Sequence, residues 1–438
     1  MRAEAAVIGG GFSGTMAAVQ LLRQGAQSVV LVEARGRVAS GVAYSTNEPF
    51  HLLNVPAKSM SAFPDQPAHF AEWLQRNHGL GPDEFAPRRL FRAYLHQVLD
   101  EARDERLTIV DGEAAALHRE EEGLAIELSD GRRIECRAAV LTGGNLPSRR
   151  PPLRAEAERQ GLPYIADPWA PEAREALAVA AAQREDVLIL GTGLTMVDMC
   201  LTLDALGLQG RILATSRRGL LPQVHQAYEP APMEAPEANL RALVRQTRER
   251  ARAHGWRAAI DALRPHTVAL AKAMPLADWR RFVTHVRPYW DVHRHRIAPA
   301  IGVRLEQLRA GGRLEVVPGR GRLEGGEIAI ERRGGGGIVR RRIGAIVNCT
   351  GPGRDILDTE DPLIPQLLES GIARPDAIGM GLDVDDESRV VAADGAAHPD
   401  IFAIGPLSRG RFWEVVAVPD IRGQAASVAA QLLRSHRL

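Results

Sequence analysis

Two glycine-rich turns hold the residues of this sequence whose types and spacing could bind a nucleotide. The first turn, Gly9-x-Gly11-x-x-Gly14, lies between a short apolar run and a segment of helix-forming composition. In such a strand–turn–helix unit the first glycine makes the tight turn, the second lets the backbone approach a pyrophosphate, and the third lets the helix pack close to the strand. The helix is expected over residues 15–23, and Phe12 and Ser13, in the turn that leads into it, are expected among the contacts of the anion at the helix N-terminus.

An acidic residue follows this turn at the sequence separation that dinucleotide-binding units show. The next apolar run ends in Glu33, about 20 residues after Gly14, which is the separation expected of a carboxylate that accepts a hydrogen bond from a ribose hydroxyl. Ala34 and Arg35 then open a loop that could wrap a cofactor phosphate. We therefore predict a dinucleotide site here. The alternative is a glycine turn in an α/β unit that binds nothing.

The second turn, Gly191-x-Gly193, also follows an apolar strand, and Leu194 and Thr195 begin the segment after it. Met196 takes the place of the third glycine. Because the first two glycines contact the pyrophosphate and the third affects mainly helix packing, this departure still permits a second dinucleotide site.

The strand after the second turn ends without an acid. It runs into Arg217 and Arg218 instead. An arginine at this place favours the 2′-phosphate of NADP over the free ribose of NAD, so we predict NADPH as the second nucleotide. The alternative is that both arginines are simply exposed charges.

Two later strands also run into glycine. One ends at Gly351, and the other ends at Gly405, which Pro406 follows before a C-terminal helix. A strand–glycine turn that feeds a helix could place backbone N–H groups against a cofactor. We therefore include these three residues among the expected cofactor contacts.

Composition excludes several classes of function. The 55 basic and 54 acidic residues give a net charge of +1 without a long run of one sign, which argues against a nucleic-acid or membrane-surface protein. None of the three cysteines forms a Cys-x-x-Cys pair, so neither a zinc site nor a redox dithiol is expected. The sequence has no signal core and no apolar stretch of about 18 residues. We expect a soluble, cytoplasmic protein.

A histidine- and arginine-rich stretch lies at residues 285–296. His285, His293 and His295 do not have the spacing of zinc ligands with partner carboxylates, so no metal is expected. Packing with surface salt bridges is one reading of this stretch. A cationic pocket for an anionic substrate or for the phosphates of NADP is the other.

Periodicity indicates the elements that must position these turns. Amphipathic helices are predicted at residues 69–78 and 91–102, and strands at 107–110, 124–128 and 138–141. In the later part of the chain, helices and strands follow one another less regularly. Helices are expected at 239–253, 256–263 and 278–300, and short strands at 313–317, 327–330, 337–340 and 345–348.

The combination of two glycine turns, an acid after the first, arginines after the second and a late strand–glycine–helix resembles the flavoproteins with two dinucleotide-binding domains. More narrowly, the chain resembles the bacterial FAD/NAD(P)-binding proteins of the YdhS type. The stretches that carry this resemblance are Gly41-Val-Ala-Tyr44, His51-Leu-Leu-Asn54-Val-Pro, Ser216-Arg-Arg-Gly-Leu-Leu-Pro222, His293-Arg-His-Arg296 and Asn348-Cys-Thr-Gly-Pro352.

The resemblance implies an α/β fold with two Rossmann-like domains. A discontinuous FAD domain would take residues 1–165 and 335–438, and an NAD(P)H domain would take residues 166–334, with a helical insertion at about 228–310. Gly9, Gly11, Gly14 and Glu33 would hold the ADP part of FAD, while Gly405 and its neighbours would approach the flavin. Gly191, Gly193, Arg217 and Arg218 would hold NADPH.

The reaction expected from this resemblance is that of an FAD-dependent, NADPH-using monooxygenase, which oxygenates a small molecule with O2 through a peroxyflavin. Residues 164–169 lack the Phe-x-Gly-x-x-x-His fingerprint of Baeyer–Villiger enzymes, which argues against that subclass. Two alternatives share the same motifs: an NADPH dehydrogenase or reductase that passes electrons to an organic acceptor or a protein partner, and a non-catalytic nucleotide-binding sensor. The oligomeric state is left open.

Four residues are candidates for roles around the flavin. Asn54 and Trp413 are expected near its ring, and Glu414 and Arg422 are expected to handle the substrate or a proton. Because the cofactor carries the hard chemistry, the protein mainly has to position and shield it.

Overall fold

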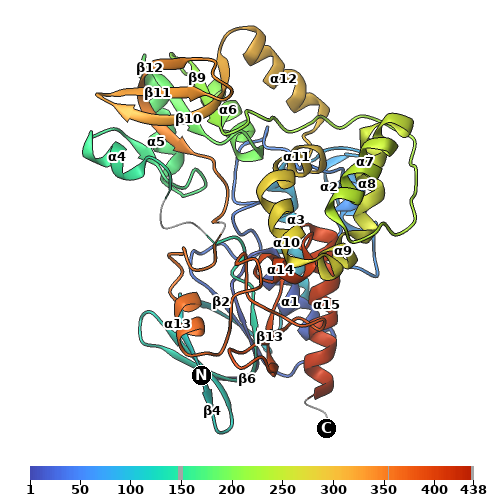
Figure 1. Cartoon of the computed structure of the whole chain (residues 1–438). Coiled ribbons are helices and arrows are strands. Elements are labelled where there is room, and N and C mark those ends of the chain that lie inside the picture. The colour runs from blue at the N-terminus through green and yellow to red at the C-terminus, as the bar shows by residue number, and fades with distance from the viewer. Residues whose placement is uncertain (147–150, 354, 436–438) are drawn as a thin grey trace.

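The computed structural model describes residues 1–146, 151–353 and 355–435, and they form an α/β fold with two sheets (Figure 1). Both sheets have parallel strands at their centres, so the predicted fold class is confirmed. The first sheet lies in the lower half of Figure 1 and the second at the upper left, while a group of helices occupies the upper right.

The first sheet has eight strands, and its centre follows the order β14-β6-β1-β2-β3 with all neighbours parallel. Its parallel strands are β1 (Arg2–Ile8), β2 (Val29–Glu33), β3 (Leu107–Asp111), β6 (Arg133–Leu141) and β14 (Ala397–Ala403). Three strands join it in antiparallel fashion: β4 (Ala114–Glu120), β5 (Gly123–Leu128) and β13 (Arg389–Val391). Helices cover the parallel centre, so β1 and β2 read as nearly continuous apolar runs.

Helices pack on both faces of this sheet. On one face, α1 (Phe12–Arg23) lies against both α15 (Val418–Ser435) and α3 (Arg88–Ala102), and α2 (His69–His78) packs on α3. On the other face, α13 (Leu363–Glu369) packs against the β4 strand. All residues of α1 except Arg23 are buried, so this helix is fixed in the core of the domain.

The second sheet has six strands in the order β11-β10-β9-β8-β12-β7. They are β7 (Tyr164–Ile165), β8 (Asp186–Leu190), β9 (Ile212–Ser216), β10 (Leu314–Glu324), β11 (Glu327–Arg332) and β12 (Ile338–Asn348). The accompanying helices are α4 (Arg154–Arg159), α5 (Ala173–Ala182), α6 (Leu194–Ala205) and α12 (Pro299–Ala310).

The β12 strand corrects one prediction. Residues 338–348 form a single strand, where the sequence pattern indicated two short ones. Its first half pairs with β11 and its second half with β8, so one strand serves two partners. The expected domain boundary at residue 335 therefore falls inside the second sheet.

The helical insertion lies between β9 and β10. It contains α7 (Leu240–His254), α8 (Trp256–Leu263), α9 (Thr267–Ala273), α10 (Leu276–Arg281) and α11 (Arg287–Arg294). The single helix predicted for 278–300 is instead divided by a π-helical turn at Phe282–Val286 and by an irregular link before α12. Pro288 and Pro299 each lie in the first turn of a new helix, where a missing N–H group costs nothing.

The remaining short elements are four helical turns. Three of them are 3₁₀ turns at Ala57–Ser59, Arg264–His266 and Gly405–Ser408, and the fourth is α14 (Arg409–Phe412). Within the described ranges, no helix is both long and apolar enough to cross a membrane.

Candidate functional site

The first glycine turn is built as the spacing requires. Gly9 has φ +108°, and a Cβ there would lie 2.7 Å from the Thr142 carbonyl oxygen at the end of β6. A Cβ on Gly14 would lie only 1.7 Å from the Gly9 carbonyl oxygen. Both positions therefore need glycine, and the turn sits at the edge where the parallel strands β1 and β6 end. Ligands bind at this edge in sheets of this type.

The start of α1 is open to an anion. Gly11 is the N-cap residue, and no side chain caps the helix. The loop after β2 folds back over this turn, because Ala39 N–H donates to the Gly10 carbonyl oxygen at 2.8 Å. The Phe12 ring packs towards Phe91 in the core, so Phe12 can offer only its backbone to a ligand.

Glu33 lies directly beside the turn. Its Oε2 accepts from Gly10 N–H at 2.6 Å, and its Oε1 accepts from Arg35 N–H at 3.0 Å. These bonds hold the carboxylate at the end of β2, where a ribose hydroxyl could still donate to it. Ala34 and Arg35 are exposed at the start of the following loop.

The late strand–glycine turn reaches the same place but differs from the expectation. Gly405 has φ +70°, and a Cβ there would lie 2.5 Å from Ser13 Oγ, so this turn touches the start of α1. However, Gly405 N–H donates to Gln424 Oε1 at 2.8 Å, and Pro406 has no N–H. In this arrangement neither residue offers a backbone N–H group to a cofactor, and the expected cofactor contact of this turn stays a prediction. Their hydrogen-bonding capacity serves the protein itself.

The second glycine turn repeats the geometry of the first. Gly191 has φ +105°, and a Cβ there would lie 2.1 Å from the Cys349 carbonyl oxygen. Gly193 is the N-cap of α6, which has no side-chain cap, and a Cβ there would meet no atom within 4 Å. Leu194 and Thr195 form the half-buried first residues of the helix. The open space beside Gly193 suits a ligand that approaches the backbone.

Gly351 belongs with this second turn. It follows β12 two residues after Cys349, whose carbonyl oxygen is adjacent to Gly191. Gly351 is exposed and has φ +80°. Gly351 falls within the segment 335–438 that was expected to belong to the FAD domain, whereas it lies beside the second glycine turn.

The two arginines after β9 lack carboxylate partners in the part of the chain that the structure describes. Arg217 is exposed. Arg218 is half-buried, its Nε is enclosed without a hydrogen-bond partner, and its guanidinium carbon lies 5.7 Å from the centre of the Tyr289 ring. An enclosed guanidinium with an unused donor fits a phosphate ligand.

The four candidates for roles around the flavin all make contacts within the protein: Trp413 and Glu414 contact the insertion, and Arg422 and Asn54 contact other segments. Trp413 is 7% exposed and packs edge-on against Trp279 at 4.7 Å in the core of the insertion. Arg422 donates to the Ser61 carbonyl oxygen at 2.7 Å, and burial lowers its pKa. The carbonyl oxygen of Asn54 lies 2.9 Å from Nε2 of His225, a histidine between β9 and the insertion helices.

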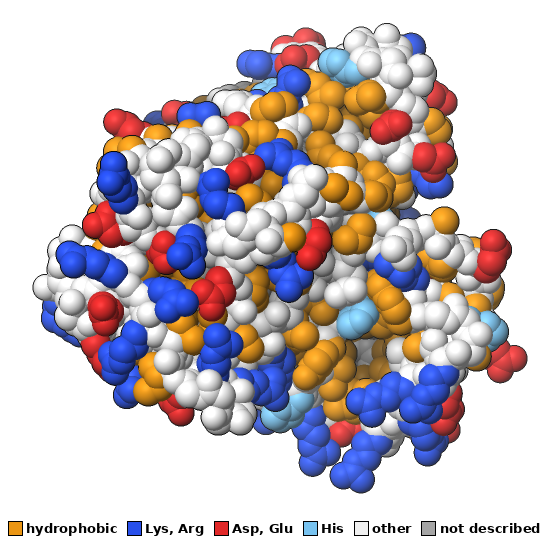
Figure 2. All heavy atoms as spheres, turned by 90° about the horizontal axis from the view of Figure 1, so that it is seen from above, with side chains coloured by type: hydrophobic (Ala, Val, Ile, Leu, Met, Phe, Trp, Pro, Cys, Tyr) orange, Lys and Arg blue, Asp and Glu red, His pale blue; other side chains and the backbone are white. Residues whose placement is uncertain are grey.

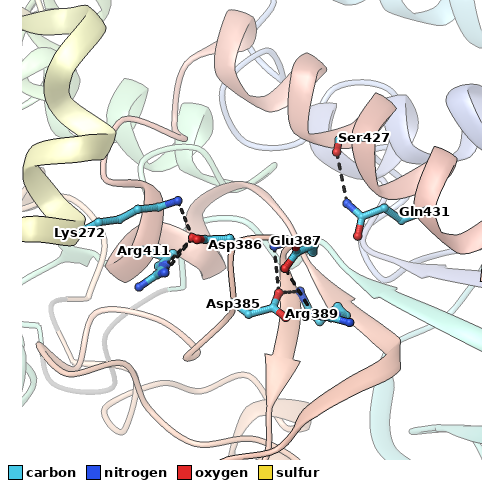
Figure 3. Close-up of polar contacts among 8 residues, drawn as sticks. All are labelled: Lys272, Asp385, Asp386, Glu387, Arg389, Arg411, Ser427 and Gln431. Atoms are coloured by element: carbon cyan, nitrogen blue, oxygen red, sulfur yellow. Dashed lines mark hydrogen bonds and ion pairs between the residues drawn. The ribbon is translucent and has the colours of Figure 1, made fainter.

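Glu414 joins the insertion to the segment after β14. Its Oε1 accepts from Trp290 Nε1–H at 3.2 Å, and its Oε2 accepts from Arg294 Nε–H at 2.9 Å. A second contact of the same kind is drawn in Figure 3, where Lys272 of α9 lies 2.5 Å from Asp386 and Arg411 of α14 lies 2.7 Å from it. The insertion is thus bound to the loops of the first domain by ion pairs as well as by the packing of Trp413.

Sequence reasoning missed a buried ion pair that connects the two sheets. Arg88 at the start of α3 lies 2.9 Å from Asp198 in α6, and their side chains are 13% and 8% exposed. His51 Nε2 lies 3.1 Å from the Asp198 carbonyl oxygen and 3.0 Å from Thr202 Oγ1. The available signal was Asp198 itself, an acid with apolar residues on both sides of it in the sequence of α6.

Arginines are distributed in two different ways. Arg241, Arg245, Arg248 and Arg252 are exposed along one face of α7, and Figure 2 shows Lys and Arg side chains gathered at the lower right, the side on which Figure 1 places this helix. This is the solvent face of an amphipathic helix. A second group, enclosed rather than exposed, lies between α11 and the turn after β14.

Carboxylates neutralise part of the positive charge of this enclosed group. Arg287 lies 3.3 Å from Asp291, and Arg294 lies 2.9 Å from Glu414. Arg409 donates to Asn145 Oδ1 at 2.9 Å, just beyond the end of β6. Burial, helped by the neighbouring Arg287, lowers the pKa of Arg409 to about 10.

The three cysteines are all buried free thiols. Burial raises the pKa of Cys136 to about 12 and raises the pKa of both Cys200 and Cys349 as well. Because thiolates are the reactive form, these residues are unsuited to thiol–disulfide exchange. Across the described ranges, no three His, Cys, Asp or Glu side chains are grouped as metal ligands would be.

Comparison with known proteins agrees with this geometry. Residues 6–146 match a protein family described as FAD-NAD(P)-binding. Over 98 residues the chain is 38% identical to an uncharacterized protein of Mycobacterium tuberculosis, and this match covers 21% of the chain and 17% of that protein. The chain therefore matches well under two thirds of the length of that curated relative.

Solved structures share the whole fold. The ornithine hydroxylase PvdA of Pseudomonas aeruginosa has a TM-score of 0.65 at 17% identity, with 99% of each chain covered. The thioredoxin reductase of Lactococcus lactis has a TM-score of 0.56 at 12% identity, with 99% of this chain and 98% of that chain covered. At these identities the similarity establishes the two-domain FAD/NAD(P) fold and not a reaction.

Proposed function

We propose that the protein is an FAD-dependent, NADPH-using monooxygenase that acts on a small molecule with O2, and that it is of the YdhS type. The observation that carries the proposal is the pair of uncapped helix starts, at Gly11 and Gly193, each behind a glycine turn at the strand ends of its own sheet. The first has a carboxylate beside it, and the second has two arginines without carboxylate partners in the described structure.

The residues at the first turn fit FAD. Gly9 and Gly14 leave no room for a side chain and Gly11 carries none, so the pyrophosphate would be able to reach the N–H groups of Phe12 and Ser13. Glu33 would accept a ribose hydroxyl. When bound, FAD supplies the ability to accept a hydride from NADPH and to react with O2.

The residues at the second turn fit NADPH. Gly191 and Gly193 would let the backbone approach its pyrophosphate, and Gly351 lies beside them. Arg218 would donate its unused Nε–H to the 2′-phosphate, with the exposed Arg217 adding charge. The domains proposed to hold the cofactors correspond to the two sheets, with β7 and β12 assigned to the NADPH domain.

Two features favour a small-molecule reaction over disulfide reduction. The only thiols are buried, and burial raises the pKa of each, so the chain offers no thiolate for exchange. The insertion is bound through Trp413 and Glu414 to the loop after β14, and a helical cover at the proposed flavin site would exclude water from it. The fold itself does not decide between the two reactions, because it is shared by proteins named as ornithine hydroxylases and as thioredoxin reductases.

Rapid mixing of the FAD-loaded protein with NADPH without oxygen, followed by addition of O2, tests the proposal. We expect fast loss of oxidised-flavin absorbance and then, with O2, a spectrum distinct from both oxidised and reduced flavin before oxidised flavin returns. Direct return with stoichiometric H2O2 would support the reductase alternative. Bound FAD that NADPH does not reduce would support the sensor alternative.

A further inference from the structure

Two connections of the chain join the proposed FAD domain to the proposed NADPH domain. One follows the end of β6 and the other follows the end of β12. They contact each other, because Gly353 N–H donates to the Leu146 carbonyl oxygen at 2.9 Å. A few loop residues at the ends of elements are enough to serve as a hinge between domains. The orientation of the two domains is therefore set by contacts that other segments of the chain make.

One segment of the proposed FAD domain is embedded in the proposed NADPH domain. Phe50, Leu52 and Phe85 pack against the hydrophobic core cluster of the second sheet and its helices. The side chain of His51 is 2% exposed, and its Nε2 lies 3.1 Å from the Asp198 carbonyl oxygen in α6. The segment thus enters the core of the other domain, and rotation of the domains would expose its apolar side chains to water.

A buried ion pair lies beside the embedded segment. Arg88 of α3 and Asp198 of α6 come from different domains, and 2.9 Å separates their charged atoms. Arg88 Nε–H also donates to the Leu52 carbonyl oxygen at 3.1 Å, and the guanidinium carbon lies 5.7 Å from the centre of the Trp169 ring. One guanidinium therefore contacts both domains at once, and rotation of the domains would break its ion pair.

The insertion attaches the same two domains at a second place. It lies between β9 and β10, so it belongs to the proposed NADPH domain, and its helix α9 lies against α14 of the other domain (Figure 1). Arg294 of α11 lies 2.9 Å from Glu414, and these side chains are 12% and 4% exposed. Beside this pair, Trp413 packs edge-on against Trp279 and Phe282. Each attachment therefore combines a buried ion pair with apolar packing.

We infer that the ion pairs Arg88–Asp198 and Arg294–Glu414 hold the proposed NADPH domain in one orientation against the proposed FAD domain. A domain that is attached at two places besides its hinge cannot turn about the hinge without breaking an attachment. Transfer of a hydride from NADPH to the flavin, with oxidation of NADPH to NADP⁺, would then take place in the arrangement that Figure 1 shows. The four residues are positioning residues, and the inference rests on the proposed function.

A cleavable crosslink between the domains tests the inference. Glu48 and Arg174 of α5 face each other across the boundary at 2.7 Å, and the Arg174 side chain is 64% exposed. Because the three native thiols are buried, a bismaleimide with a disulfide spacer should join only the new thiols of the Glu48→Cys/Arg174→Cys variant. The FAD-loaded variant is mixed rapidly with NADPH without oxygen, before and after crosslinking.

We expect the crosslinked variant to lose its oxidised-flavin absorbance at a rate within about twofold of the rate before crosslinking, because no domain rotation has to precede hydride transfer. A larger loss that is recovered when the spacer is reduced would show that the domains must rotate. That result would overturn the inference.

Pulsed EPR measures the orientation without any reaction. Spin labels on Arg103→Cys, just after α3, and on Val179→Cys, in α5, place one exposed label in each domain. We expect one distance between them, which NADP⁺ leaves unchanged. A second distance, or a shift on addition of NADP⁺, would overturn the inference. One fixed distance in a protein that NADPH does not reduce would support the fixed orientation and reject the proposed function alone.

Asp198→Asn tests whether an ion pair does the positioning. It should add a second distance and slow flavin reduction at saturating NADPH about tenfold, with FAD affinity unchanged, because the two domains are no longer held in the reactive arrangement. Asp204→Asn is the matched control, since Asp204 lies on the same helix but pairs with Arg304 inside the proposed NADPH domain. It should keep one distance and a rate within about twofold of the wild type.

Thermal melting of each variant checks that it is folded. If Asp198→Asn does not fold, Glu414→Gln at the second attachment takes its place. A folded Asp198→Asn variant that keeps the single distance and the wild-type rate would overturn the assignment of the pair, and so would equal effects of Asp204→Asn.

Discussion

Replacement of Gly14 by alanine should break the first nucleotide site through packing alone. The new Cβ would lie 1.7 Å from the Gly9 carbonyl oxygen and 2.7 Å from Thr142 Oγ1. Since real Cβ contacts stay above 3.0 Å, α1 would have to move by at least about 1.3 Å from β1. The helix cannot move freely, because all its residues except Arg23 are buried and it packs on α15 and α3.

The expected change in the free energy of unfolding of Gly14→Ala is the difference between two opposing contributions. Overpacking in a dense core costs about 1–3 kcal/mol, and so close a backbone contact belongs at the upper end. Alanine recovers up to about 1 kcal/mol through its helix propensity. We expect the free energy of unfolding to fall by about 2 kcal/mol, and FAD affinity to fall by about tenfold or more because the N–H groups of the helix start move.

Gly193→Ala is the matched control on the second turn. Its Cβ would meet no protein atom within 4 Å, so the free energy of unfolding should change by less than about 0.5 kcal/mol. Its FAD affinity should stay unchanged while its NADPH affinity falls, because the methyl group enters the space proposed for the pyrophosphate. Urea unfolding and cofactor titration measure both variants. The reasoning is refuted if Gly14→Ala keeps the stability and FAD affinity of the wild type.

Four other changes test separate parts of the structure. Glu33→Gln should weaken FAD binding about tenfold in a fluorescence titration, because the ribose contact loses its charge; an unchanged Kd would remove Glu33 from the site. Arg218→Ala should weaken NADPH binding about tenfold or more and spare NADH, and equal losses would argue against a 2′-phosphate contact. Asp198→Asn should cost about 3–5 kcal/mol in urea unfolding by leaving buried Arg88 unpaired, whereas a loss below about 1 kcal/mol would contradict that account. The pKa of His295 is about 4 in the folded protein against 6.5 ordinarily, so between these values the unfolded chain binds more protons and stability falls as pH falls; His295→Gln should flatten this dependence, and an unchanged slope would show that His295 does not cause it.

Local spacing was enough to predict the nucleotide turns and much of the secondary structure. The turn at Gly9 and the helix at 69–78 form where periodicity and glycine placement indicated, because both depend on residues close in sequence. The second turn formed in spite of Met196, which is buried in the core of its domain.

The surroundings of the late turn could not be predicted in the same way. Gly405 carries the glycine that a tight turn requires, but its N–H is taken by Gln424, a residue on the following helix. Trp413 looked like a ring contact for a cofactor, and its neighbours Trp279 and Phe282 come from the insertion. Such contacts depend on how distant elements dock, and a linear pattern carries no signal for docking.

The side-by-side packing of α1 and α15 governs the order in which the chain can mature. The central strand β1 is made first, yet its sheet also needs β14, and the first helix needs the last one as its neighbour. The second sheet, by contrast, has all its strands once residue 348 has been synthesised. The proposed NADPH domain can therefore fold on the ribosome while the proposed FAD domain waits until β14 and α15 have been synthesised. Flavin loading would then be a late event, and a nascent chain stalled before β14 should capture no FAD.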